Sequence, residues 1–100
     1  MRKDEFKKWL LVRIKQKPAN DYVSRCKTVE TSLQVDLDEE FAIDKGKLLL
    51  SKMQYSVEDE RANKEAPEGF HFKENAHIRF RMSNLRSAVN IYFDFCEETI

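Results

Sequence analysis

The sequence predicts an all-α fold, a compact bundle of four to five helices. Apolar residues recur at steps of three and four in the last quarter of the chain, which is the spacing of one helix face. Only two glycines and two prolines occur in 100 residues, so the chain has little of the turn chemistry that hairpins need. We expect residues 1–100 to form one domain, because shorter pieces bury too little surface to fold. Two origins stay open, a domain of a longer protein and a small stand-alone protein.

The first two helices are expected over residues 3–16 and from Ala19 or Asn20 onward. Pro18 should break the chain between them, because proline disrupts a helix interior. The residues expected to face inward from the first helix are Phe6, Trp9, Leu10 and Ile14, and those from the second are Tyr22, Cys26, Val29 and Leu33.

The middle of the chain predicts two shorter helices and a loop. Acidic residues from Asp36 to Glu40 favour a helix cap followed by a short helix, since the free N–H groups of a helix start attract them. Gly46 should end or interrupt this helix. A fourth helix is expected over residues 47–55, with core side chains Leu48, Leu49, Leu50 and Met53. Residues 56–69 are polar and predict a long mobile connector, which Phe70 and Phe72 should then pin onto the bundle.

The last helix is expected from near Asn75 to near Glu97. Its inward stripe consists of Ile78, Met82, Leu85, Val89, Tyr92 and Cys96. A second row lies on its outer side and consists of Phe80, Asn84, Ser87 and Ile91. This row predicts either that the helix runs through the middle of the bundle or that the row meets something outside the domain.

Charge is sorted along a chain whose net charge is zero. Residues 1–30 hold nine Lys or Arg and four Asp or Glu, a net +5, and residues 31–70 hold five and ten, a net −5. Residues 71–100 balance at four and four. If the first and last segments pack side by side, the domain should have a basic and an acidic face, a polarity that can orient a protein on nucleic acid. Solvated helix faces are the alternative.

The sequence indicates a cytoplasmic protein. No apolar run approaches the roughly 18 to 20 residues that cross a bilayer, and residues 1–5 lack the apolar core of a secretory signal. Cys26 and Cys96 lie within apolar stripes, where we expect them to be core residues rather than a disulfide or a reactive thiol.

We expect no catalytic residue, cofactor or metal in this chain. His71 and His77, with Glu68 and Glu74, lack the close spacing of a zinc site. The acidic run that begins at Asp36 lacks the glycine turn and distal glutamate of a calcium loop. Neither histidine has the Ser or Cys context of nucleophilic catalysis, and two isolated glycines cannot form a phosphate-binding loop.

Several segments together resemble the SAM-like core-binding domain of phage-integrase-type tyrosine recombinases. They are Phe6-x-x-Trp9-Leu10, Tyr22-x-Ser24-Arg25 with Val29-Glu30, Leu37-Asp38, and Leu85-Arg86-Ser87-Ala88-Val89-x-x-Tyr92-x-x-Phe95. A related helical module in some restriction-type nucleases is similar too. The family's catalytic set includes a His-x-x-Arg element in a second domain. Here Phe80 stands three residues after His77, so the element is not reproduced.

The resemblance implies a non-catalytic helical clamp that grips duplex DNA beside a separate catalytic domain. Its contacts should be mostly to phosphates. The candidate residues are Lys8, Lys15, Lys17, Arg25, Lys27, Arg79, Arg81 and Arg86. Ser24, Lys27, Thr28 and Thr31 form the candidate face for reading sequence. The competing hypothesis is a protein-interaction or oligomerisation domain that uses Phe80, Ile91, Tyr92, Phe93 and Phe95, since aromatic residues are favoured at such contacts.

Overall fold

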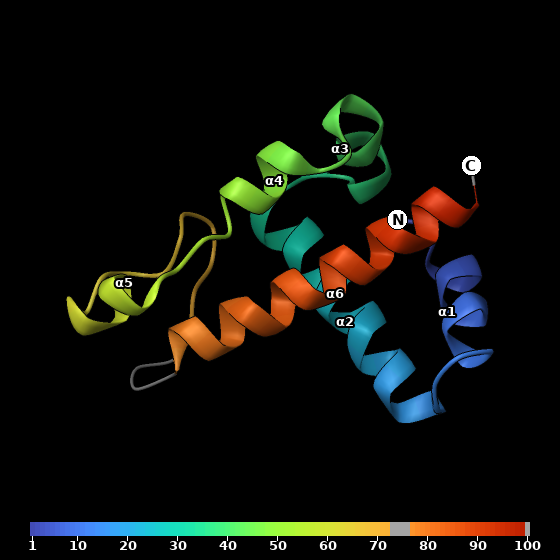
Figure 1. Ribbon diagram of the computed structural model, residues 1–100, viewed down its shortest axis with the longest axis horizontal. Helices are drawn as coiled ribbons and strands as arrows, with labels where there is room; N and C mark the ends of the chain where they lie inside the picture. The colour runs from blue at the N-terminus through green and yellow to red at the C-terminus, as the bar shows by residue number, and fades with distance from the viewer. Residues whose placement is uncertain (73–76, 100) are drawn as a thin grey trace.

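The computed structural model describes residues 1–72 and 77–99. Its elements are α1 (Lys3–Leu11), α2 (Gln16–Leu33), α3 (Leu37–Asp44), α4 (Lys47–Ser51), α5 (Val57–Arg61) and α6 (Ile78–Glu98). Figure 1 shows α6 running the length of the molecule, with α2 crossing behind it, α1 at one end and α5 at the other. The all-α prediction is confirmed, because the described residues contain no strand. They form six helices rather than the four or five expected.

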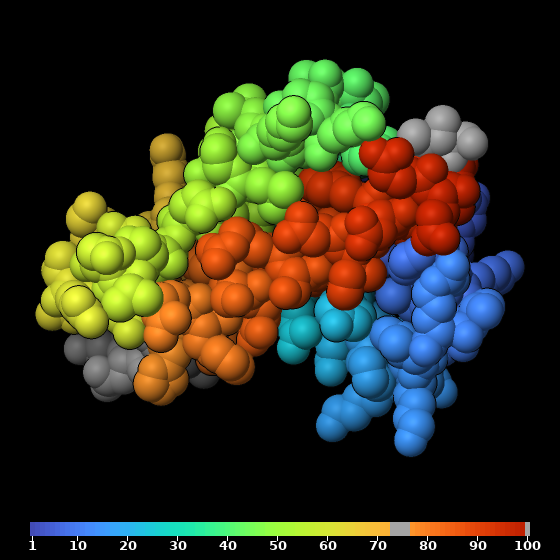
Figure 2. Space-filling model, in the orientation of Figure 1, coloured from blue at the N-terminus to red at the C-terminus, as the bar shows by residue number. Residues whose placement is uncertain are grey.

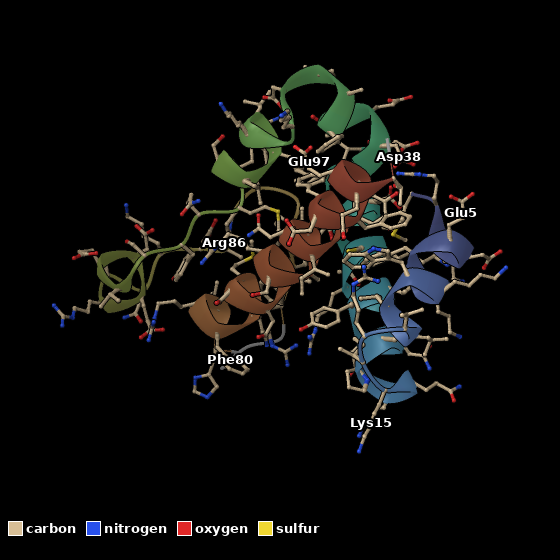
Figure 3. All side chains as sticks on the ribbon, turned by 45° about the vertical axis from the view of Figure 1, so that its right-hand side comes forward. Glu5, Lys15, Asp38, Phe80, Arg86 and Glu97 are labelled. Atoms are coloured by element: carbon tan, nitrogen blue, oxygen red, sulfur yellow. The ribbon has the colours of Figure 1, made fainter. Side chains whose placement is uncertain are left out.

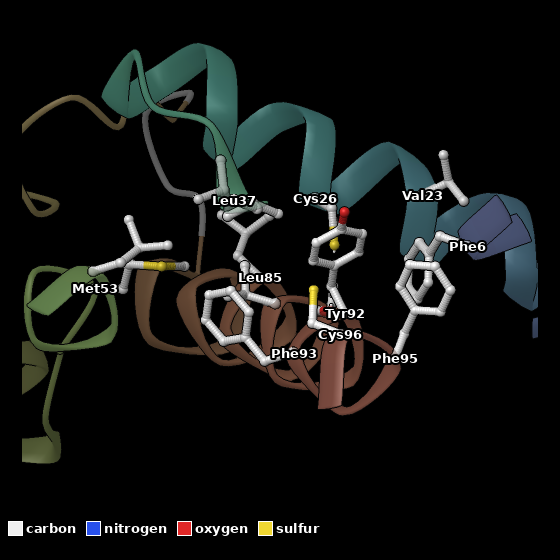
Figure 4. Close-up of a cluster of buried hydrophobic side chains, with 14 of the residues drawn as sticks. Phe6, Val23, Cys26, Leu37, Met53, Leu85, Tyr92, Phe93, Phe95 and Cys96 are labelled. Atoms are coloured by element: carbon white, nitrogen blue, oxygen red, sulfur yellow. Dashed lines mark hydrogen bonds between the residues drawn. The ribbon is translucent and has the colours of Figure 1, made fainter. Parts of the chain in front are cut away.

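The long helix α6 is the centre of the core. Of the predicted inward stripe, Ile78 is partly buried and the other five side chains are buried. Figure 4 shows Leu85, Tyr92 and Phe95 of α6 facing Leu37, Cys26 and Phe6. The stripe was predictable because it repeats at helical spacing through more than five turns. Asn75, the predicted start, lies outside the described residues, and the helix begins at Ile78.

The boundary between the first two helices differs from the prediction. Helix α1 ends at Leu11, five residues before the expected end, and α2 already begins at Gln16. Pro18 is therefore the third residue of α2 and does not break a helix. The first N–H groups of a helix have no acceptor within it, so a proline in the first turn costs no hydrogen bond. The side chains that α2 buries are Ala19, Val23, Cys26 and Val29, while Tyr22 and Leu33 are only partly buried.

Helix α3 begins as predicted, and Gly46 separates it from α4. The Asp36 carboxylate accepts a hydrogen bond of 2.8 Å from the Asp38 N–H. Gly46 has φ +81°, and a Cβ atom there would overlap the ring of Phe93, so both the backbone and the packing require glycine. The fourth helix ends at Ser51 rather than Tyr55. Leu48, predicted as a core residue, is 53% exposed.

The predicted mobile connector instead contains helix α5. Ser56 and Asp59 form a capping box, in which the Ser56 hydroxyl accepts from the Asp59 N–H at 3.1 Å and the Asp59 carboxylate accepts from the Ser56 N–H at 2.8 Å. The Tyr55 hydroxyl then donates to the Lys64 carbonyl at 2.6 Å. Phe70 is buried and Phe72 packs partly buried against the core, so the two rings hold this segment on the bundle as expected, and they also stack on each other at 6.4 Å.

The amino-terminal ammonium, just before α1, forms ion pairs with carboxylates of α2 and of the start of α3. The Met1 nitrogen lies 3.1 Å from carboxylate oxygens of both Glu30 and Asp36 and 3.5 Å from Asp38. The Tyr92 hydroxyl donates to Asp38 at 2.5 Å. These contacts join the start of the chain to the carboxyl-terminal half of α6, and Figure 1 shows the N-terminus beside the last turns of α6.

The thermal stability of this chain, with its free amino terminus, is expected to fall at both ends of the pH scale. Burial lowers the pKa of the Met1 ammonium, but hydrogen bonds to Glu30 and Asp36 outweigh burial and raise it above 8.0. Its stabilisation is complete below pH 8.0 and is lost as pH rises through the raised pKa. Burial raises the pKa of Asp36, but hydrogen bonds from the Asp38 N–H and Met1 outweigh it and hold the pKa below 3.8. That contribution is lost as pH falls through the lowered value.

The measurement is thermal unfolding by circular dichroism across this pH range, for the wild type and Asp36→Asn. The variant should lose less stability than the wild type above pH 8.0 and again below pH 3.8. If the melting temperatures of the wild type and of Asp36→Asn change in parallel with pH, the role assigned to the Met1 ammonium and Asp36 is contradicted.

Both cysteines are core residues, as expected. They are free, and the exposed fractions are 0% for Cys26 and 2% for Cys96. The Cys26 thiol donates to the Ala88 carbonyl at 3.3 Å. Burial, with a smaller effect of Glu30, raises the pKa of Cys26 to about 12, so this thiol stays protonated at neutral pH. In the described part of the chain, no helix combines the length and the apolar character that a bilayer crossing requires.

Candidate nucleic-acid interface

The structure divides the three arginines of α6 between two flanks. Arg79 and Arg86 lie on the flank that faces α5 and the end of α4. The Arg79 Nε lies 3.1 Å from a Glu60 carboxylate oxygen, and Arg86 donates to the Met53 carbonyl at 2.9 Å. Figure 3 shows Arg86 facing the α4–α5 segment, while Phe80 projects from the other side of α6. Arg79 and Arg86 therefore have partners within the domain, a carboxylate and a backbone carbonyl, and their predicted role in DNA binding stays a prediction.

Arg81 lies on the opposite flank, since two residues correspond to roughly 200° around a helix. There it meets α2 across an open groove with a volume of about 540 Å³. The residues that line this groove are Arg25, Thr28, His77, Phe80, Arg81, Asn84 and Leu85. We call it the α2–α6 groove. It brings together two of the eight predicted basic residues, one from each helix.

The α2–α6 groove has a cationic lining without a carboxylate. In the described part of the chain, neither Arg25 nor Arg81 lies within 4.0 Å of an acidic group. Instead the guanidinium of Arg25 lies 5.9 Å from the ring centre of Tyr22, and that of Arg81 lies 5.8 Å from the ring centre of Phe72. Such cation–π contacts orient a guanidinium and leave its N–H donors available to a ligand.

The four predicted lysines are exposed but do not converge on the groove. Lys8 lies on α1, and Lys15 precedes α2 and projects from the lower edge of Figure 3. Lys17 lies two turns before Arg25, roughly 80° away around α2, so it extends the same side of the helix. Lys27 follows Arg25 by two residues and lies on the other flank of α2. The eight basic residues therefore form no single surface.

The segments of opposite charge lie on different sides of the molecule. Figure 2 shows residues 1–20 at the lower right and residues 37–61 along the upper left, with α6 between them. The first and last segments do pack side by side, through α1 and α2 against α6. The acidic side is the one that binds Arg79, through Glu60.

The residues proposed for the alternative interaction surface are mostly core residues. Tyr92, Phe93 and Phe95 have exposed fractions of 0%, 6% and 1%, and Ile91 packs partly buried against the core. These three rings pack against α1 and α3 within the domain, so they present no exposed surface to another subunit. Phe80 differs from them, with 65% of its side chain exposed.

Sequence reasoning did not assign His77 to a binding surface, and it placed Asn84 on the outer row of α6 without connecting it to the arginines. His77 immediately precedes α6, and Asn84 lies one turn beyond Phe80. The candidate reading face of Ser24, Lys27, Thr28 and Thr31 is exposed, and Thr28 lies at the groove. In the described ranges, no three His, Cys, Asp or Glu side chains cluster as a metal site would require, and Glu74 lies outside those ranges.

No protein-family model matches this chain, and neither a curated protein nor a solved structure matches it.

Proposed function

We propose that this domain binds the phosphate backbone of duplex DNA through the α2–α6 groove, without catalysing a reaction. The observation that carries the proposal is that Arg25 and Arg81, on two different helices, line one open groove that contains no carboxylate. The resemblance to the SAM-like core-binding domain of recombinases supports the same function. In this role the domain is a clamp for a catalytic domain on a longer chain or on a partner.

The physical basis is the neutralisation of phosphates. A guanidinium matches two phosphate oxygens with two N–H donors, and each neutralised phosphate releases condensed counterions. Such binding does not depend on sequence, and its Kd is typically about 10⁻⁴ to 10⁻⁶ M at physiological salt. The net charge of zero makes a local cationic groove, rather than the charge of the whole protein, the source of attraction.

Lys17 extends the proposed contact toward the start of α2. It is exposed, and no acidic group in the described part of the chain lies within ion-pair distance of it. Asn84 supplies an amide beside the arginines, whereas the Thr28 hydroxyl already donates to the Ser24 carbonyl at 3.1 Å. The N–H groups of Asn84 add a hydrogen bond to phosphate or sugar, a kind of contact that positions a protein on DNA without specifying sequence.

Arg81→Ala is expected to reduce the salt dependence of DNA binding, and Arg79→Ala is not. The loss of one phosphate contact lowers the slope of log K against log salt by about 0.9. Arg79 is the matched control, since it has the same side chain two residues away but contacts Glu60. Fluorescence anisotropy of a labelled blunt duplex, titrated at several salt concentrations, measures both slopes. An equal change in the two variants, or no binding of the wild type at low salt, would contradict the proposal.

A further inference from the structure

Phe80 is an exposed aromatic ring within a cationic groove. Its side chain is 65% exposed, and it lines the α2–α6 groove beside Arg81, its neighbour in sequence. The other strongly exposed apolar residues, among them Val12, Ile43 and Leu48, are aliphatic and none of them lines this groove. Phe80 is therefore the position where a large exposed apolar side chain adjoins guanidinium groups that have no acidic partner among the described residues.

Folding does not account for this ring. Phe80 is absent from the core and from the partly buried residues that pack against it, whereas Phe70 and Phe72 of the preceding segment belong to these sets. The ring also makes no aromatic pair with another described side chain. An exposed aromatic face is available to stack on a flat ligand.

We propose that Phe80 stacks on an unpaired base of DNA while Arg25 and Arg81 bind the phosphates on either side of it. This inference rests on the proposed function and names its preferred substrate, a duplex that contains an unpaired nucleotide. Aromatic side chains and arginines are the groups with which proteins hold unstacked nucleotides. In the interior of a fully paired duplex every base face is covered by its neighbours, so away from the ends Phe80 gains a stacking partner only where pairing is interrupted.

Asn84 contributes a contact to the same base. It lies four residues after Phe80, so the two side chains occupy neighbouring positions on one face of α6. Its amide has both donors and an acceptor, as the edge of an unpaired base does. The expected substrate is therefore recognised by stacking from Phe80, by hydrogen bonding from Asn84 and by charge from the arginines.

The test measures the affinities of the wild type and of Phe80→Ala for a gapped duplex and for a fully paired duplex of the same length. The strand opposite the gap carries one unpaired 2-aminopurine at that position, and its fluorescence reports stacking. The wild type should bind the gapped duplex more tightly, and the variant should lose roughly 5-fold to 100-fold of affinity for it but keep its affinity for the paired duplex. Ile43→Ala, at a 75% exposed position on α3, is the matched control and should bind as the wild type does.

The outcomes separate this inference from the proposed function. If the wild type binds both duplexes equally and Phe80→Ala binds them with the same affinities, the stacking role is overturned, while the phosphate contacts remain supported. Absence of binding to either duplex at low salt would overturn both. Sedimentation of the protein without DNA tests the competing hypothesis that a second copy of the chain covers Phe80. A wild-type dimer that becomes a monomer in Phe80→Ala would assign the ring to this contact between copies. Circular dichroism should show unchanged folding, because Phe80 lies outside the core.

Discussion

Phe6→Ala is expected to lower the free energy of unfolding by about 3 to 5 kcal/mol. Phe6 is fully buried and joins α1 to α6 through its ring. Its ring centre lies 4.9 Å from that of Tyr92 in an edge-on arrangement, and 5.4 Å from that of Phe95. The variant loses these contacts and leaves a cavity that the rigid helices cannot close. A loss of this size is a large part of the 5 to 15 kcal/mol that typically stabilises a domain.

Urea unfolding followed by circular dichroism measures this loss. Val12→Ala is the control, because Val12 lies just beyond the same helix but is 85% exposed, and it should change stability by less than about 0.5 kcal/mol. Phe6→Leu should fall between the two, since it keeps most of the apolar volume. A midpoint for Phe6→Ala equal to that of the wild type would show that α1 does not pack on α6 through this ring.

The parts of the fold that could be predicted are those in which the sequence pattern that indicates a helix lies within that helix or at its cap. The inward stripe of α6 repeats at helical spacing, and the acidic residues before α3 signal its cap at Asp36. The positions of Pro18 and of α5 were not predicted. Proline is compatible with the first turn of a helix as well as with a break between helices, so Pro18 alone does not decide where α2 begins. Helix α5 is only five residues long, and it is stabilised by a capping box rather than by an apolar face.

The candidate site was predictable only as a set of basic residues. Periodicity places Arg79 and Arg86 on one flank of α6 and Arg81 on the other. It does not reveal that Glu60, 19 residues before Arg79, binds one of them, or that the Met53 carbonyl, 33 residues before Arg86, binds the other. Glu60 comes from the segment expected to be a mobile loop, and Met53 lies near the end of the expected fourth helix, beyond the observed end of α4. The sequence alone therefore could not separate arginines that contact the fold from those available to a ligand.

The double variant Arg25→Glu with Arg81→Glu is expected to reduce the affinity for duplex DNA by about 100-fold at moderate salt, about 0.1 M. Both phosphate contacts are lost, and two carboxylates then face the phosphates across the groove, where like charges cost several kcal/mol. Each reversal changes the charge by −2, so the net charge falls from 0 to −4. The loss exceeds what that net charge alone causes, because binding depends on where the positive charges lie.

The matched control is Lys45→Glu with Arg79→Glu, which also has a net charge of −4. In the wild type these cations form ion pairs with Glu97 and Glu60, so they are not the groups assigned to phosphate binding. We expect the control to lose less than about tenfold in affinity, by anisotropy with the same duplex, because long-range repulsion is screened over about 10 Å at moderate salt. Equal losses in the two double variants would show that overall charge governs binding, and that the α2–α6 groove is not its site.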